Sequence, residues 1–257
     1  MEAIAEKNFT RYTRAVDLKR VDFIVKNLRR HIPDTGKVLD VGCGNGNISI
    51  QLGGLGYMVQ GVDVSDKAIK KAKETNTFAN VRFDVISAEQ LVADGKTYNA
   101  VICSEVLEHL EKPENLVKTL YSLLADNGIL IVTVPNGKGP REVLMTKPMQ
   151  KMRSGDGVMW KITNGVKKML GYSGTTVQSD ADNLDHIQFF SHADLYHMAD
   201  NNGFKIIEFG HADWMEDIFP YSFLSKRIHA LQRLDCAIAD KLPHSMVGGF
   251  QTIWVKK

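Results

Sequence analysis

The sequence lacks several features that would place the chain in a specialised class of protein. It has three cysteines in 257 residues, a small and odd number, so we expect buried thiols and no disulfide framework. No run of about 18 consecutive apolar residues occurs, so we expect no membrane-spanning helix. The N-terminal stretch carries charges throughout and has no apolar core of signal-peptide length. These absences predict a soluble, cytoplasmic protein.

The chain carries almost no excess charge of either sign. Its 32 lysines and arginines against 30 aspartates and glutamates leave a net charge of +2. No overall field therefore favours nucleic acid, and we expect no nucleic-acid partner. Residues 138–170 are an exception, because they hold eight basic and two acidic side chains. The overall composition, 44% hydrophobic and 24% charged, is ordinary for a globular protein, and we expect one domain over residues 1–257.

What the sequence does contain is an alternation of short Val/Ile/Leu runs with helical patterns from residue 37 onward. Such runs are typical of parallel strands buried on both faces and joined by crossover helices. The sequence therefore predicts a doubly wound α/β sheet, whose ligands lie beyond the carboxyl ends of the strands. Strands are expected near residues 37–42, 57–64, 81–86, 98–104, 129–136, 204–210 and 248–257.

Two segments stand outside this alternation. Residues 16–31 have apolar side chains at helical spacing and predict an amphipathic helix on the sheet, within an N-terminal helical arm of residues 1–35. Residues 137–183 break the pattern and are rich in Gly, Met and Lys. Because they directly follow the fifth expected strand, we interpret them as an inserted helical lid over the ligand site at the carboxyl ends of the strands. Their basic and apolar side chains would suit an anionic or lipid-linked substrate, or transient contact with a membrane surface. A solvated basic face is the alternative.

Three glycines, Gly42, Gly44 and Gly46, follow the first expected strand at every second position. A glycine-rich turn from strand to helix lets a ligand approach the backbone and offers helix N-terminal amides to an anion. A dinucleotide site would need a glycine where Asn47 stands, so the spacing disfavours a nicotinamide cofactor. Asp63 ends the second strand, where a carboxylate can accept hydrogen bonds from both ribose hydroxyls of an adenosine. An adenosine with an amino-acid tail fits this loop better than one with a pyrophosphate.

Four segments in this order carry a family resemblance: "VLDVGCGNG", "GVDVS", "YNAVICSEVLEHL" and "LLADNGILIVTVPN". The chain resembles the class I S-adenosylmethionine-dependent methyltransferases. Among them it is most similar to the ubiquinone-biosynthesis O-methyltransferase group and to relatives that methylate sugars and natural products. The resemblance implies a Rossmann-like seven-stranded sheet, mostly parallel with an antiparallel last strand, and S-adenosylmethionine as cofactor.

The resemblance also implies residues that contact this cofactor. The three loop glycines would line its methionine and ribose portions, and Asp63 would bind the ribose. Asp40 would hold the loop or contact the methionyl amine. Val64 would pack on the adenine, and Ser104 would lie against the methionine portion.

The remaining implied contacts lie at the two ends of the cofactor. Ser87 and Ala88 would meet the polar edge of the adenine. The family commonly has Asp where Ser87 stands, so backbone amides or Glu89 would take over that recognition. Arg20 matches an arginine that reaches the cofactor carboxylate, and Tyr12 would close the site. For these two residues, a surface arginine and a packing tyrosine are the alternatives.

Four side chains suggest either a metal site or acid–base catalysis. Glu105, Glu108 and His109 follow the fourth strand at spacings that would place all three on one face of a single helical turn. His186 lies later in the chain, before a Phe pair, and small-RNA 2′-O-methyltransferases show a similar combination around a metal. The four residues could hold a divalent cation, or His109 and His186 could act as catalytic bases. The alternative is that the segment with Glu105, Glu108 and His109 is simply typical of the family and has neither role. His192, another histidine of this region, is interpreted as a surface or capping histidine.

These observations predict an S-adenosylmethionine-dependent methyltransferase, with O-methylation of a small or lipid-linked hydroxylated acceptor as the leading reaction. N- or C-methylation, which would need no metal, is the alternative within enzymes. A non-catalytic S-adenosylmethionine-binding partner is the alternative from a different class. The sequence does not name the acceptor or the oligomeric state.

Overall fold

The structure is a computed structural model that describes residues 12–33, 35–140, 143, 186–216, 218, 221–225 and 227–257. The expected lid over residues 137–183 therefore lies outside the described residues, apart from its beginning. Within the described part of the chain, no helix is both long and apolar enough to cross a membrane.

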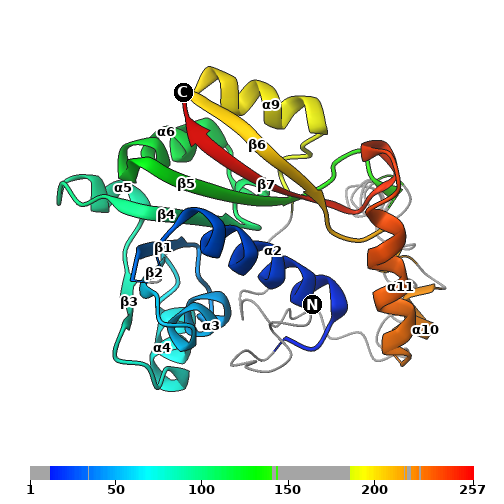
Figure 1. Cartoon of the computed structure of the whole chain (residues 1–257), viewed down its shortest axis with the longest axis horizontal. Coiled ribbons are helices and arrows are strands. Elements are labelled where there is room, and N and C mark those ends of the chain that lie inside the picture. The colour runs from blue at the N-terminus through cyan, green and yellow to red at the C-terminus, as the bar shows by residue number, and fades with distance from the viewer. Residues whose placement is uncertain are drawn as a thin grey trace, which may run out of the picture.

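A seven-stranded sheet forms the centre of the molecule, in the order β3-β2-β1-β4-β5-β7-β6 (Figure 1). Strand β7 is antiparallel to both of its neighbours, β5 and β6, whereas the pairs from β3 to β5 are parallel. This arrangement confirms the expected doubly wound, mostly parallel sheet with an antiparallel last strand. The strands are β1 (Lys37–Val41), β2 (Met58–Asp63), β3 (Val81–Val85), β4 (Tyr98–Ser104), β5 (Leu124–Pro135), β6 (Phe204–His211) and β7 (Gly249–Lys256).

Helices cover both faces of the sheet. One apolar core joins the sheet to α2, α3 and α4, and a second joins its other face to α5, α6 and α9. Figure 1 shows α2 lying across the sheet, with α10 and α11 beyond the ends of β6 and β7. The helices are α2 (Ala15–His31), α3 (Asn47–Gly54), α4 (Asp66–Thr75), α5 (Ala88–Val92), α6 (Pro113–Leu123), α9 (His192–Asn201), α10 (Tyr221–Ser225) and α11 (His229–Ala239), with 3₁₀ turns η1 (Leu107–His109) and η3 (His244–Met246).

The N-terminal helix α2 follows from the spacing of its apolar residues. Val21, Ile24, Val25 and Leu28 are buried on one side of the helix, as the sequence predicted. The helix ends at His31 because Pro33 disfavours helical backbone in the residue before it. The N-terminal end of α2 consequently lies at the carboxyl edge of the sheet, since β1 runs back from the opposite edge.

The reversal of strand order falls between β1 and β4, because β1 leads on to β2 and β3 in one direction and β4 leads on to β5 in the other. In such sheets the crevice at the carboxyl ends of these two strands receives the ligand. The three cysteines, Cys43, Cys103 and Cys236, are buried and free, which confirms the expectation of no disulfide among them.

Candidate active site

The glycine loop connects β1 to α3 with left-handed backbone at all three glycines. The φ angles of Gly42, Gly44 and Gly46 are 68°, 52° and 77°, a region that L side chains rarely adopt. Neighbouring side chains add a second restriction, because a Cβ on Gly42 would lie 2.5 Å from Val106 and one on Gly46 would lie 2.5 Å from Phe83. The side chains packed against the loop therefore leave no room for a side chain at Gly42 or at Gly46.

Asp63 ties the end of β2 to this loop. One oxygen of its carboxylate accepts a hydrogen bond from the Gly44 backbone N–H at 2.9 Å, and the other accepts one from the Ser65 N–H at 2.8 Å. The neighbouring Val64 is 77% exposed. A carboxylate beside a loop of backbone amides, next to an exposed apolar side chain, provides the surfaces that a ribose and an adenine require.

Asp40 lies beneath the loop and is buried. Burial raises the pKa of its carboxyl to about 7, although the Ser49 hydroxyl, which donates to it at 2.6 Å, acts in the opposite direction. Because Ser49 belongs to α3, this hydrogen bond joins β1 to the helix that follows the loop. The geometry thus supports the loop-holding role among the two predicted for Asp40.

The residues predicted around the two ends of the cofactor are all placed near the carboxyl edge. Ser87 is the N-cap of α5, and its backbone N–H donates to the Gln90 side chain at 2.8 Å, so that amide is already engaged. Ala88 is buried in the first turn of the same helix. Ser104 ends β4 and is buried, with its hydroxyl 2.9 Å from that of Thr133.

Tyr12 and Arg20 pack together at the N-terminal end of α2. Tyr12 is buried, and its ring centre lies 5.8 Å from the Arg20 guanidinium. Burial raises the pKa of Tyr12 to about 12, so its hydroxyl is protonated at neutral pH. Arg20 is 9% exposed and forms an ion pair with Asp17 at 2.7 Å. Arg20 is therefore a buried cation rather than a surface arginine.

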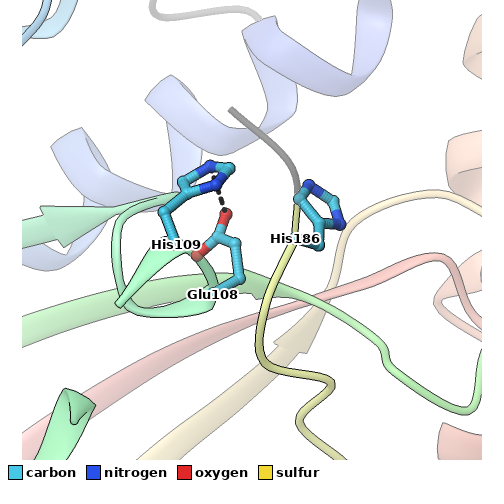
Figure 2. Close-up of side chains that lie close together, drawn as sticks. All are labelled: Glu108, His109 and His186. Carbon is cyan, nitrogen blue, oxygen red and sulfur yellow. Dashed lines mark ion pairs between the residues drawn. The ribbon is translucent and has the colours of Figure 1, made fainter. Parts of the chain in front are cut away.

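A compact cluster of side chains that could hold a metal ion lies just beyond β4. Ligand atoms of Glu108, His109 and His186 lie within 4.8 Å of one another (Figure 2). Glu108 is 1% exposed, and its Oε1 is 3.8 Å from Nε2 of His109. The Glu108 carbonyl accepts backbone hydrogen bonds from Ile187 at 2.8 Å and Gln188 at 2.9 Å. These two bonds bring His186 to η1 from a distant part of the chain.

One buried carboxylate and two imidazoles fit a divalent transition metal. Oxygen and nitrogen donors of this kind suit Mn, Fe, Co or Zn, and three protein ligands leave positions open for an acceptor. Val106, which lies two residues before Glu108 in the sequence, packs against Gly42 of the glycine loop. The cluster thus adjoins the loop.

Glu105 does not lie in this cluster. The prediction of a single helical turn over these glutamates is wrong at Glu105, because η1 begins only at Leu107 and Glu105 has left-handed backbone with φ of 57°. Its Oε1 accepts a hydrogen bond from the Thr133 hydroxyl at 2.8 Å and lies 3.7 Å from the Arg20 guanidinium.

Sequence reasoning predicted Arg20 and Glu105 as site residues but missed Arg14, Asp17, Thr133 and Gln251, which line the same pocket. A pocket between the N-terminal end of α2 and the carboxyl edge of the sheet is lined by Arg14, Asp17, Arg20, Glu105, Thr133 and Gln251. Two of these residues could have been recognised from the sequence. Asp17 precedes Arg20 by one helical turn, and Thr133 places a hydroxyl group within the apolar run of β5. Gln251 could not have been recognised, because its strand reaches this edge only through the fold.

A seven-stranded sheet with this order, together with a glycine loop tied to an acidic strand end, defines the class of Rossmann-like methyltransferases. Two solved methyltransferase structures share this fold. Magnesium protoporphyrin IX methyltransferase from Synechocystis, with bound SAH, superposes with a TM-score of 0.57 at 20% identity, covering 94% of this chain and 84% of that one. An S-adenosylmethionine-dependent methyltransferase from Methanosarcina mazei gives a TM-score of 0.58 at 17% identity, covering 90% and 96%.

The family profile described as "Methyltransferase domain" matches residues 9–208, which is most of the chain. The chain therefore belongs to this methyltransferase family, and its cofactor is S-adenosylmethionine.

Curated relatives match less than half of the chain. The mitochondrial ubiquinone biosynthesis O-methyltransferase of Bos taurus is 36% identical over 131 residues, which is 46% of this chain and 35% of that protein. The ubiquinone biosynthesis O-methyltransferase of Glaesserella parasuis is 31% identical over 107 residues, 39% of this chain and 45% of that one. The matched part thus spans less than half the length of these relatives.

Proposed function

We propose that this chain transfers a methyl group from S-adenosylmethionine to a hydroxyl of a small acceptor, and that the acceptor is of the quinol or catechol type. The observation that carries the proposal is the cluster of Glu108, His109 and His186 beside the glycine loop. Relatives named for ubiquinone O-methylation support the same reaction class.

The cofactor contacts are proposed as follows. Asp63 accepts hydrogen bonds from the ribose hydroxyls, Val64 covers the adenine, and Ser87 and Ala88 border its polar edge. Arg20 pairs with the cofactor carboxylate, and Tyr12 closes this end. The loop glycines, Asp40 and Ser104 shape the floor beneath the ribose and methionine portions.

The cluster would remove the hydroxyl proton that O-methylation must release. A bound divalent cation would lower the pKa of a hydroxyl that it contacts. Glu108, His109 and His186 would hold such a cation and orient two neighbouring oxygens of a catechol. Alternatively, His109 or His186 takes the proton directly as a general base. In both cases the alignment of the oxygen behind the sulfonium methyl supplies much of the rate.

The charge of the insertion is relevant to the chemical class of the acceptor. Eight basic side chains against two acidic ones in residues 138–170 support a lipid-linked or anionic acceptor and transient contact with an anionic membrane surface. Co-sedimentation of the full chain with vesicles containing anionic lipid, compared with neutral vesicles, tests the membrane contact. A cytoplasmic location stays a prediction.

Methyl transfer from labelled S-adenosylmethionine to a simple catechol tests the reaction, with aniline as the competing acceptor. We expect methylated catechol, loss of turnover after chelation and its recovery when Mn²⁺ is returned. Glu108→Ala should reproduce chelation, whereas Glu111→Ala, at an exposed position two residues after the end of η1, should not. Full turnover by the metal-free protein would instead support a histidine base, and methylation of aniline alone would support N-methylation.

A further inference from the structure

Gln251 is a buried polar residue of β7 whose side-chain amide lacks a hydrogen-bond partner. It is 2% exposed, and its Nε2 has no partner among the residues that the structure describes. Its neighbour Thr252, by contrast, donates from its hydroxyl to the Val132 carbonyl at 2.9 Å. Buried N–H groups are normally paired, because an unpaired one has lost its hydrogen bonds to water without replacement. The unpaired amide of Gln251 therefore indicates a partner outside the chain.

The pocket at the N-terminal end of α2 is where such a partner can bind. Gln251 lines this pocket, as do Thr133 and Glu105. Gln251 pairs with Thr133 of β5, and directly opposed residues of two antiparallel strands point to the same face of the sheet. Ile131 and Ile253, two positions along each strand, belong to the core beneath α2. The amide and the hydroxyl thus lie on the face of the sheet that α2 covers.

The pocket lies beside the proposed cofactor site, on the side away from the adenine. The glycine loop follows β1, whereas Gln251 lies on β7, three strands along the sheet and about 14 Å away. Asp63 ends β2, on the opposite side of β1. Arg20, which is proposed to pair with the cofactor carboxylate, also lines the pocket. The pocket therefore begins where the cofactor is expected to end, and a methyl acceptor can occupy it together with the cofactor.

The wall that faces Gln251 is held in place by contacts within the protein. Arg14, just before α2, pairs with Glu216 at 3.0 Å. The ammonium group of Lys19 donates to the Ala212 carbonyl at 3.0 Å. These contacts join the first turns of α2 to the segment after β6. Because the pocket is formed before a ligand binds, a hydrogen bond in it can select one ligand over another.

The pocket presents polar groups, which suit the head group of an acceptor better than an apolar tail. Asp17, Glu105 and Asp213 contribute carboxylates to its lining. Asp17 pairs with Arg20 at 2.7 Å, and Glu105 accepts a hydrogen bond from the Thr133 hydroxyl at 2.8 Å. The Nε2 of Gln251 is a donor, so its ligand must offer an atom that accepts a hydrogen bond.

We propose that Gln251 is a specificity-determining residue for the methyl acceptor. Its Nε2 donates a hydrogen bond to a hydroxyl oxygen of the acceptor ring that lies outside the catechol pair. This inference rests on the proposed O-methylation of a catechol-type acceptor. It adds a residue that distinguishes one such acceptor from another.

Calorimetry of the full chain, in the presence of S-adenosylhomocysteine and Mn²⁺, measures this contact with two matched pairs of compounds. Pyrogallol is compared with 3-methylcatechol, and 1,2,4-benzenetriol with 4-methylcatechol. Within each pair, a hydroxyl and a methyl group occupy the same ring position. We expect the hydroxyl compound of at least one pair to bind at least about tenfold more tightly, because a site that hydrogen-bonds a hydroxyl rejects an analogue that lacks it.

Variants assign this preference to the amide. Gln251→Met keeps the length of the side chain and removes its hydrogen-bonding groups, so we expect it to lose the preference while it binds the methyl compounds as the wild type does. It should also bind S-adenosylhomocysteine with unchanged affinity. Thr252→Val, on the opposite face of β7, is the matched control and should keep the preference of the wild type.

The melting temperature of the ligand-free protein separates recognition of a ligand from a structural role. Gln251→Met replaces an unpaired buried amide by an apolar group, so we expect the melting temperature to rise by about 2 °C or more. Thr252→Val loses a hydrogen bond that the fold does make, and its melting temperature should fall. A lower melting temperature in Gln251→Met would give the amide a structural role and overturn the inference.

Three binding results would also overturn it. The first is equal affinity of the wild type for both members of each pair, which includes no binding of any of the four compounds. The second is a preference that survives in Gln251→Met. The third is weaker S-adenosylhomocysteine binding by Gln251→Met, which would assign the amide to the cofactor. Absence of methyl transfer to catechol would contradict the proposed function instead, and the binding comparison would still decide the role of Gln251.

Discussion

At the scale of single residues, the site depends on side chains that serve both the fold and a ligand. Asp63 already accepts two backbone hydrogen bonds, from Gly44 and Ser65. The remaining lone pairs of a carboxylate can still accept ribose hydroxyls, since its two oxygens offer about four acceptor sites. Removing the carboxylate would therefore loosen the loop as well as the ligand.

We predict that Asp63→Ala weakens S-adenosylhomocysteine binding by tenfold or more. Each hydrogen bond to a charged group contributes about 1.5–3 kcal/mol, and the variant loses those to the ribose and to the loop. Calorimetry would measure the affinity, and circular dichroism would check the fold. Asp66→Ala, at the exposed start of α4, is the matched control. An unchanged affinity in folded Asp63→Ala would remove Asp63 from the site.

At the scale of elements, three histidines from separate segments meet at one end of the sheet. Nε2 of His211 on β6 lies 2.8 Å from Nδ1 of His244 in η3, and His192 of α9 stacks on His244 with ring centres 3.9 Å apart. Burial, and then the neighbouring histidines, lower the pKa of both His192 and His244. His192, expected as a surface or capping histidine, is the half-buried first residue of α9 and belongs to an imidazole cluster.

This cluster predicts a loss of stability in mild acid. The folded state favours neutral His192 and His244, so their contribution is present at neutral pH and is lost as pH falls through the ordinary histidine pKa near 6.5. His244→Phe keeps the ring stack without the charge, and we expect its melting temperature to fall less than that of the wild type between pH 7.5 and 5.5. His197→Phe, on the exposed side of α9, should follow the wild type. Parallel curves for all three proteins would contradict the prediction.

The elements differ in how far the sequence predicts them. Apolar runs predicted all seven strands, because the apolar side chains that a strand buries in the core form a local pattern in the sequence. β5 begins at Leu124, five residues before the strand expected near 129–136, and its pairing with β4 shifts register between Tyr98 and Ala100. The position of Glu105 was not predictable either, because its left-handed backbone depends on contacts with Thr133 and Arg20 that are distant in sequence.

At the scale of the whole molecule, the site draws on most of the chain. The loop and Asp63 come from the first half, His186 comes from beyond the insertion, and the pocket wall includes β7 at the C-terminus. A ligand that contacts these parts binds the folded state alone. Its binding must therefore stabilise the entire domain by mass action.

We predict that S-adenosylhomocysteine raises the melting temperature of the chain and that NAD does not. Ligand at a hundred times its dissociation constant adds about 2.7 kcal/mol, and each kcal/mol corresponds to roughly 2–4 °C for a domain of this size. Differential scanning fluorimetry over a concentration series measures the shift. Stabilisation by NAD instead would reverse the assignment of the glycine loop.

The backbone around the insertion has a consequence for how such a protein can diversify. The Gly137 N–H donates to the Phe190 carbonyl at 2.8 Å, so the chain leaves the sheet and returns to it at one point. A segment whose two ends are bonded to each other can change in length or composition at little entropic cost to the rest of the fold. If the insertion covers the acceptor, as predicted from the sequence, evolution can replace it as a unit and so alter which acceptor is methylated, while the sheet and the glycine loop are inherited unchanged.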